Sequence, residues 1–409
     1  MHNIKNPPAV GWANVGLLGI SHFVADFYCN VLPILLPLLA VKFGFSYAAC
    51  GSLFMAFQVV ASFLQPPLGL MADRKSINWI MPVSIITSGI LACAVFETDS
   101  VLILILIVIM SGLCSSGFHP VAGGIVPLVA PKNKDILATS IFIAGGNIGF
   151  ALAPTLVAFY LHYVGQEDLL YLSAPALITA ALIFMRRLHI KAKPSGLIVL
   201  PKVHEIVRNK PFMIFILGIC LRAWSYCAMV IYLALVFTEM GYNLAQSSSG
   251  ILAMLLGVTA GGLIVGSLSL RFGMKQLIIM TLIVSIAAET VFVIKADLSV
   301  ISYIALFVMG AGLYGSTPVA IVWSERMLYG SAAFSSSMIL GFTFGVGYVA
   351  SVISGYIGDY IGLLNGIAIT TIPSLIAALV LFMFLKEPPA PDAAAAGSPA
   401  APAQAPQKA

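Results

Sequence analysis

The sequence predicts an all-α membrane protein whose twelve transmembrane helices form two pseudo-symmetric bundles of six. Of its 409 residues, 60% are hydrophobic and only 9% are charged, and long apolar stretches recur along the chain. A water-soluble domain carries about 25% charged residues, so this composition excludes one. The net charge of +5 is small and the basic residues stand in short clusters, which argues against nucleic-acid binding.

Twelve stretches are long and apolar enough to cross a bilayer, which requires about 20 residues. Most of them follow one another with short connections, as expected for a compact bundle. In chain order they cover residues 14–41, 47–72, 77–96, 100–126, 136–162, 167–188, 212–238, 246–270, 276–295, 298–323, 332–357 and 362–386.

One long connection divides the spans into two sets of six. Residues 189–211 are polar, basic and proline-bearing, and they lie between the sixth and seventh spans. We therefore expect an N-terminal bundle (1–188), a cytoplasmic linker (189–211), a C-terminal bundle (212–387) and a disordered Pro/Ala-rich tail (388–409). Placing the N-terminus in the cytoplasm puts 17 of the 20 Lys and Arg residues on that side, which predicts that both termini are cytoplasmic.

The six cysteines do not predict a disulfide framework, a metal site or a cofactor. None belongs to a C-x-x-C pair or a His-rich cluster. Cys220 and Cys227 are seven residues apart on one helical face, so a soft-metal site there is an alternative to two buried thiols.

The loop after the second span resembles the G-x-x-x-D-R/K signature of the major facilitator superfamily. The residues are Gly69, Asp73 and Arg74, and the family's later glycine is replaced by Ser76. The resemblance implies a conformational latch, in which glycine allows close helix packing and the charged pair can break and re-form. The corresponding place in the second half has Leu270 instead of the aspartate.

In the fifth span, residues 145–154 resemble an antiporter motif, G-x-x-x-G-P, with Ala153 in place of the second glycine. We expect Gly149 and Pro154 to form a hinge or seal, and close packing without any role in antiport is the alternative.

Three further segments resemble the fosmidomycin resistance branch of the superfamily. They are residues 21–26 (SHFVAD), 65–69 (QPPLG) and 117–120 (GFHP), together with 140–142 and 145–147 in the fifth span. The resemblance implies the major facilitator fold and export of a drug-like compound. Where that branch is expected to have an acidic residue after the His-Pro pair, this chain has Val121.

A charged side chain at the bilayer centre costs at least ~2.5 kcal/mol, so each one is a candidate for function. Asp26 forms a stripe with His22 and Asn30 on one face of the first span. We expect Asp26 to bind the coupling proton with His22 as relay, the alternative being a structural hydrogen bond between helices. His119 in the fourth span is a substrate or proton contact, or a packing histidine.

Arg222 is the only Lys or Arg that lies well inside a predicted span, away from its ends. It could anchor an anionic substrate or pair with Asp26, and the alternative is an arginine that reaches outward to the cytoplasmic interface. We expect Glu289 to lie near the outer end of its span and reach the interface. The remaining predicted substrate contacts are Asn30, His119, Asn147, Trp224 and Tyr226.

These features favour a proton-coupled secondary transporter that exports a small drug-like or anionic compound across a bacterial inner membrane, acting as a monomer. Proton-coupled uptake and metalloid export stay open as alternatives. An enzyme is not expected, because the sequence shows no clustered catalytic set, and ATP-driven transport is disfavoured because no G-x-x-x-x-G-K-[ST] loop occurs.

Overall fold

The computed structural model describes residues 10–74, 77–132, 134–189, 203–269, 271–328 and 338–387, and within these ranges the regular structure is entirely helical. Among the described residues, nine helical stretches are long and apolar enough to cross a membrane. Three shorter apolar helices, Tyr47–Phe63, Ile80–Phe96 and Leu169–Met185, bring the number of predicted spans found as helices to twelve. The all-α, twelve-span prediction is therefore confirmed. Residues 190–202 of the expected linker and 388–409 of the expected tail lie outside the described residues.

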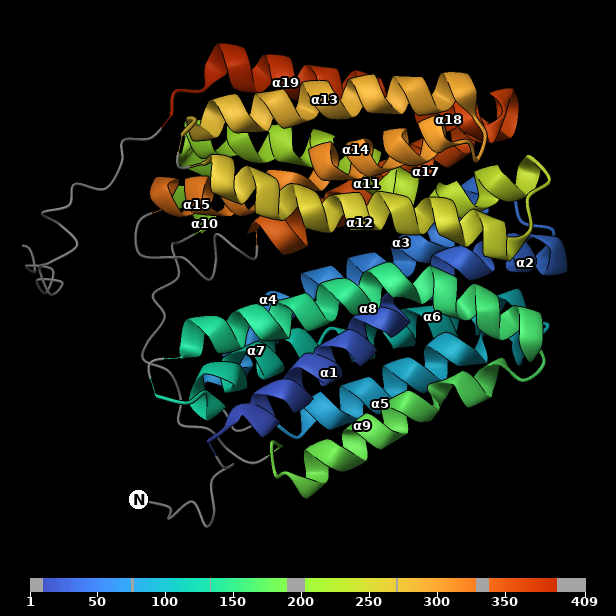
Figure 1. Cartoon of the computed structure of the whole chain (residues 1–409), viewed down its shortest axis with the longest axis vertical. Helices are drawn as coiled ribbons and strands as arrows, with labels where there is room; N and C mark the ends of the chain where they lie inside the picture. Colours follow the sequence, from blue (N-terminus) through green and yellow to red (C-terminus); the bar gives the residue numbers. More distant parts are fainter. Residues whose placement is uncertain are drawn as a thin grey trace, which may run out of the picture.

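The helices lie in two layers that run side by side (Figure 1). The layer drawn in blue to green contains α1 (Trp12–Cys29), α2 (Leu32–Phe43), α3 (Tyr47–Phe63), α4 (Gln65–Arg74), α5 (Ile80–Cys93), α6 (Val101–Ser115), α7 (Phe118–Val129), α8 (Asp135–Tyr163) and α9 (Ala174–Met185), with the short turns η1 (Ala94–Phe96) and η2 (Leu169–Ser173).

The layer drawn in green to red contains the second half of the chain. Its helices are α10 (Val203–Arg208), α11 (Lys210–Glu239), α12 (Leu244–Leu268), α13 (Met274–Lys295), α14 (Val300–Gly315), α15 (Thr317–Met327), a π-helical turn η3 (Met338–Phe342), α17 (Thr343–Ile361), α18 (Leu363–Ala368) and α19 (Thr371–Phe384).

Several spans are split at membrane depth. The first span breaks at Asn30 between α1 and α2, and the fourth at Ser116 between α6 and α7. The tenth breaks at Ser316 between α14 and α15, where Pro318 occupies the first turn of the new helix. A proline has no N–H to donate, so it is well tolerated in a first turn, and the break leaves backbone and side-chain groups free to bind across the bundle.

The two layers meet chiefly where α3 packs on α17 and α8 packs on α12. We call the end of the molecule at which α1 begins the near face and the opposite end the far face. At the far face, the carboxylate of Asp359 on α17 accepts hydrogen bonds from the backbone N–H groups of Tyr47 and Ala48, at 2.6 and 3.1 Å. Midway along, the Gln58 amide donates to the Tyr348 hydroxyl at 3.3 Å. The far face is thus bridged between the halves.

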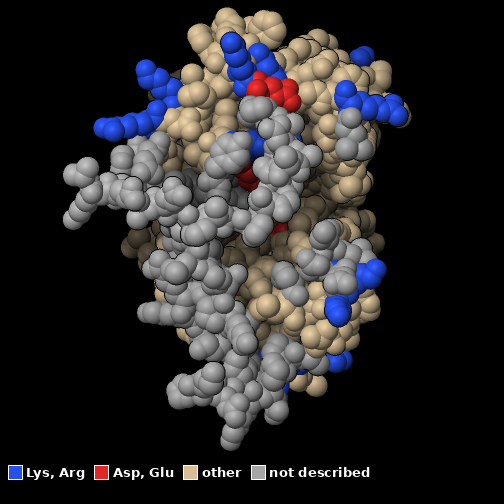
Figure 2. All heavy atoms as spheres, turned by 90° about the vertical axis from the view of Figure 1, so that its left-hand side faces the viewer, with Lys and Arg blue, Asp and Glu red and all other residues tan. Residues whose placement is uncertain are grey.

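Figure 2 looks onto the near face, which is hollowed between the two halves, and acidic atoms are visible inside the hollow. Lys and Arg side chains gather around the rim of this face (Figure 2). A basic rim of this kind is typical of the cytoplasmic side of a membrane protein.

Asp359 gives a first prediction, because it caps the positive end of a helix that belongs to the other half. Replacing Asp359 by Ala should shift the equilibrium toward an open far face about fivefold, since such a cap contributes about 1 kcal/mol. The measurement uses spin labels on cysteines that replace the exposed residues Val41 and Tyr360, in a background without native cysteines. A more open far face gives a larger population of long distances between the two labels.

The matched control is Asp297→Ala, because the Asp297 carboxylate accepts hydrogen bonds from Ser299 and Ser302 within its own half. An Asp359→Ala distance distribution equal to that of the parent and the control would contradict the bridging role.

Candidate functional site

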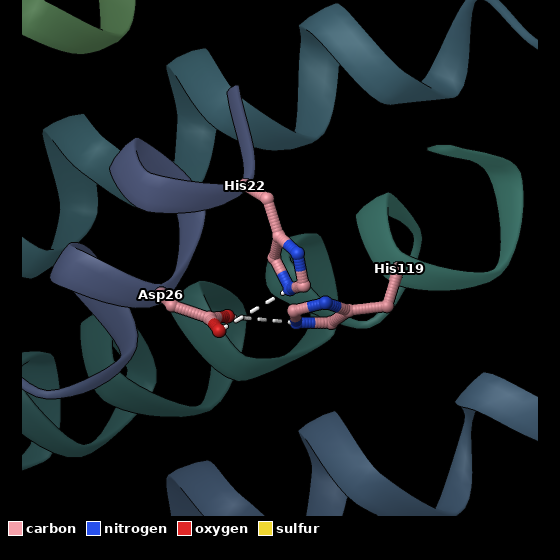
Figure 3. Close-up of side chains that lie close together, drawn as sticks. All are labelled: His22, Asp26 and His119. Atoms are coloured by element: carbon pink, nitrogen blue, oxygen red, sulfur yellow. Dashed lines mark ion pairs between the residues drawn. The ribbon is translucent and has the colours of Figure 1, made fainter. Parts of the chain in front are cut away.

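Asp26 lies at the centre of a cluster of three ionisable side chains inside the N-terminal half. His22 Nε2 is 3.2 Å from Asp26 Oδ2, and His119 Nε2 is 3.4 Å from Asp26 Oδ1. Figure 3 shows both imidazoles directed at the carboxylate, His22 from one turn earlier on α1 and His119 from the start of α7. The break between α6 and α7 places His119 there, so the structure brings His119 to the pair of Asp26 and His22 that the sequence placed on one face of the first span.

The contacts of His22 fix where its protons are. Its Nδ1 lies 2.8 Å from the backbone carbonyl oxygen of Phe142 on α8. A carbonyl oxygen only accepts, so Nδ1 must carry hydrogen. A neutral imidazole would then present a bare Nε2 to the Asp26 carboxylate, placing two acceptors 3.2 Å apart. The geometry therefore requires a cation between them, and the simplest is a proton shared by the pair.

The same three side chains could also hold a metal ion. Two imidazole nitrogens and a carboxylate oxygen lie within 4.8 Å of one another, and in the described part of the chain this is the one group of three or more His, Cys, Asp and Glu side chains so arranged. Such a donor set suits a divalent transition metal. Histidines that bind metals usually donate their second ring N–H to a carbonyl or carboxylate oxygen, and the Phe142 carbonyl would orient His22 in this way. Cys220 and Cys227 are buried free thiols of α11.

Small residues of α8 let the site form. An added Cβ at Gly145 or Gly149 would collide with the backbone carbonyl of Gly19 or Phe23 on α1. At Gly146 it would lie 2.5 Å from both Asp26 Oδ2 and His22 Nε2. The glycines therefore bring α8 close enough for its backbone to bind α1 side chains.

Asn30, the third member of the predicted stripe, makes such a bond. Its amide donates to the Phe150 carbonyl oxygen at 2.8 Å, eight residues beyond the carbonyl that binds His22. His22 of α1 and Asn30 at its C-cap thus bind backbone carbonyls of α8 at two points, on either side of the glycines where the two helices approach closely. α8 is one continuous helix through Pro154, so the hinge role of Gly149 and Pro154 stays a prediction.

Arg222 lies in the middle of α11 and is only 1% exposed. Its guanidinium donates to Ser316 Oγ at 2.8 Å and to Thr317 Oγ1 at 3.1 Å, both at the break between α14 and α15. The alternative of an arginine reaching out to the interface is therefore wrong, because hydroxyl groups of the tenth span hold the side chain inside the bundle. In this conformation Asp26 pairs with the two histidines and not with Arg222.

The two halves place these groups in equivalent ways. In the first half, the residue before Pro120, His119, contacts Asp26 of the first span. In the second half, the residue before Pro318, Thr317, contacts Arg222 of the seventh span. One backbone arrangement, a helix that restarts just before a proline, thus carries an imidazole that contacts Asp26 in one half and a hydroxyl that contacts Arg222 in the other. Tyr314 of α14 lies within electrostatic reach of both Arg222 and Asp26.

Glu289 is a buried residue that the sequence interpretation placed wrongly. It is fully buried, and its carboxylate accepts hydrogen bonds from Ser225 Oγ of α11 at 3.0 Å and Thr370 Oγ1 at 2.7 Å. Ser225 is midway along α11, so Glu289 lies deep in the bundle and not at the interface. The neighbouring break between α18 and α19, which brings Thr370 to it, could not be read from the α13 sequence.

Other predicted contacts are more dispersed. The Trp224 indole donates to Ser354 Oγ at 2.9 Å, and Tyr226 packs against the rings of Tyr314 and Phe344. The side chain of Asn147 is exposed. Gly69, Asp73 and Arg74 lie on α4, and their side chains fall outside the described residues, so the latch stays a prediction.

Comparison with known proteins assigns a family to this arrangement. A family model described as Major Facilitator Superfamily matches residues 18–338. A fosmidomycin resistance protein of Escherichia coli strain K12 is 24% identical over 383 residues, covering 90% of this chain and 92% of that protein.

Two solved structures share the fold. A bacterial homologue of the human lysosomal transporter Spinster, in an inward-facing and unoccupied conformation, superposes with a TM-score of 0.73 at 15% identity over 91% of this chain and 96% of its own. A D-xylose-proton symporter does so with a TM-score of 0.72 at 14% identity over 92% and 98%.

The close contact of α8 with α1 generates a second prediction. Gly149→Ala should destabilise the protein by about 1–3 kcal/mol, because the added methyl group meets the Phe23 backbone and forces the helices apart. Thermal unfolding of the purified protein measures this. The matched control is Gly123→Ala on α7, where a Cβ meets nothing within 4 Å, so the substitution should be neutral or slightly stabilising. Equal unfolding temperatures for the two variants would refute the packing role.

Proposed function

The chain belongs to the major facilitator superfamily, and from this premise we propose that it is a proton-coupled secondary transporter that exports a small drug-like or anionic compound across a bacterial inner membrane. The observation that carries the proposal is the position of His22 between the Phe142 carbonyl and the Asp26 carboxylate, which an added proton on the His22–Asp26 pair satisfies. A group that must hold a proton in one arrangement of helices can lose it in another. The name of the fosmidomycin resistance relative supports export of a drug-like compound.

Coupling follows if the proton and the substrate favour different conformations, since only a difference in affinity moves such an equilibrium. We place the near face in the cytoplasm, with both termini, because of its basic rim. The bridged far face and hollowed near face then correspond to an inward-facing state. When the proton leaves Asp26, the contacts from His22 and His119 reorganise, and since these join α1 to α7 and α8, the N-terminal half changes shape.

Arg222 is the proposed anchor for the substrate's negative charge. Its hydrogen-bond partners are the neutral hydroxyls of Ser316 and Thr317, which can be exchanged for an anion at little cost, whereas a carboxylate partner would have to be displaced. Because Arg222 is buried in the described conformation, substrate reaches it only when the break between α14 and α15 opens.

Proton-coupled uptake is the second candidate. The same architecture serves a D-xylose-proton symporter, so the fold does not distinguish the two directions. Proteoliposomes with an imposed pH gradient do: an exporter working by antiport accumulates substrate on the acidic side, and a symporter accumulates it on the alkaline side. The first probe is fosmidomycin, the compound in the name of the resistance protein from Escherichia coli. A thermal-shift screen of phosphonates, siderophores and cationic drugs extends the set of probes.

A third prediction concerns Asp26. Asp26→Asn should reduce gradient-driven accumulation about 10-fold or more, because the amide cannot bind the coupling proton at this depth. Substrate exchange without a gradient should persist, which separates lost coupling from lost folding. Asp297→Asn, a carboxylate at the far face, serves as control and should behave like the parent. Accumulation by Asp26→Asn that keeps the parent's dependence on pH would rule out Asp26 as the coupling site.

A fourth prediction concerns Arg222. Arg222→Gln should weaken binding of an anionic probe about 10- to 100-fold, the cost of a charge-assisted hydrogen bond of roughly 1.5–3 kcal/mol, while a neutral probe binds equally well. Arg222→Lys should restore part of the loss. Glutamine can keep a hydrogen bond to Ser316 or Thr317, which protects the fold. Calorimetric titration of both variants measures the affinities, and unchanged anion binding in Arg222→Gln would eliminate the anchor.

A further inference from the structure

Glu289 holds a second buried carboxyl group, far along the chain from Asp26 and in the other half of the protein. Each of its carboxylate oxygens has one hydroxyl partner, Ser225 on one side and Thr370 on the other. These partners come from α11 and from the start of α19, so three spans converge on one carboxyl group. It is 0% exposed, so bulk water does not reach it in this conformation.

The backbone around the site is interrupted. The twelfth span is divided at Ile369 and Thr370, between α18 and α19, and Thr370 precedes the first turn of the new helix. Discontinuous helices at membrane depth are where transporters bind their substrates and coupling ions, because the break frees groups that a continuous helix would use internally. Here the break places Thr370 at the N-cap of α19, where its hydroxyl does not cap the helix and donates to Glu289 instead.

The charges around Glu289 do not neutralise it. The helices packed on α13 are α14, α15, α18 and α19. Their titratable side chains are Tyr303 and Tyr314 on α14 and Glu325 and Arg326 on α15, while α18 and α19 carry none. On α11, Arg222 precedes Ser225 by one turn but donates to Ser316 and Thr317 instead. On α13 itself, Lys275 and Lys295 lie in the first and last turns. Among the described residues, the hydrogen bonds to the Glu289 carboxylate come from the two hydroxyls.

A hydroxyl group can donate or accept, so the pair Ser225 and Thr370 can satisfy either form of the carboxyl. An ionised Glu289 accepts from both hydroxyls. A protonated Glu289 donates its own O–H to one of them and still accepts from the other. A lysine or arginine partner would hold the group ionised, whereas this environment permits exchange and its dryness favours the neutral form.

We propose that Glu289 is a second proton-binding site, which carries a proton in the described conformation and releases it to water when the contacts among α11, α13 and α19 separate. This inference rests on the proposed proton-coupled transport and extends it, because a cycle that empties both Asp26 and Glu289 moves two protons.

Infrared spectroscopy tests the proposal without a substrate. The purified parent at neutral pH should show the C=O stretching band of a buried protonated carboxylic acid, shifted in D₂O. The band should disappear in Glu289→Gln and persist in Glu325→Gln, the matched glutamate on α15, and in Asp26→Asn. Glutamine keeps a hydrogen-bonding partner for Ser225 and Thr370, and thermal unfolding of each variant verifies that it is folded.

Three results would overturn the assignment: no such band in the folded parent, a band unchanged in Glu289→Gln, or a band that sodium ions abolish at constant pH, which would make this a sodium site. A transport assay then separates this inference from the proposed function. Loss of all proton-driven accumulation in Asp26→Asn together with an unchanged infrared band in Glu289→Gln rejects only the second site. A parent with the band but no proton-driven accumulation rejects only the coupled transport.

Discussion

The absence of water at membrane depth is the constraint on which this structure depends. A polar group there must find its partner on another helix, so each one fixes which helices meet. His22 and Asn30 bind carbonyl oxygens of α8, Arg222 binds hydroxyls at the tenth-span break, and Glu289 joins α13 to α11 and α19. These groups therefore hold the bundles together as well as supplying their chemistry.

Close packing and helix breaks make these partnerships possible. Glycines of α8 bring its backbone within reach of α1 side chains, since an intervening methyl group would collide with α1. Breaks in the first, fourth, tenth and twelfth spans place hydroxyl, amide and imidazole side chains at helix ends inside the bundles. The two halves use this scaffold for different groups, a carboxylate with two imidazoles around Asp26 in one and the guanidinium of Arg222 in the other.

Much of this organisation could be predicted from the sequence, because span length and apolarity follow directly from bilayer thickness. The twelve spans, the motifs that indicate the family and the polar stripe on α1 can all be recognised within short stretches of sequence. The carbonyl that orients His22 could not be predicted, since Phe142 is 120 residues away and contributes only backbone. Glu289 was misplaced for a similar reason: its position along α13 is near the end, but its partners belong to the interiors of other spans. Depth within a bundle depends on how helices are packed, which no single span encodes.

The contact between Asp359 and the start of α3 has a consequence for which substitutions this chain tolerates. Both partners of the carboxylate are main-chain N–H groups, which every residue except proline supplies. The contact with Asp359 therefore requires no particular side chain at positions 47 and 48 other than one that is not proline, and it creates no compensating pair of substitutions. Methods that infer contacts from correlated substitutions would miss this bridge between the halves, although it spans 312 positions of the chain.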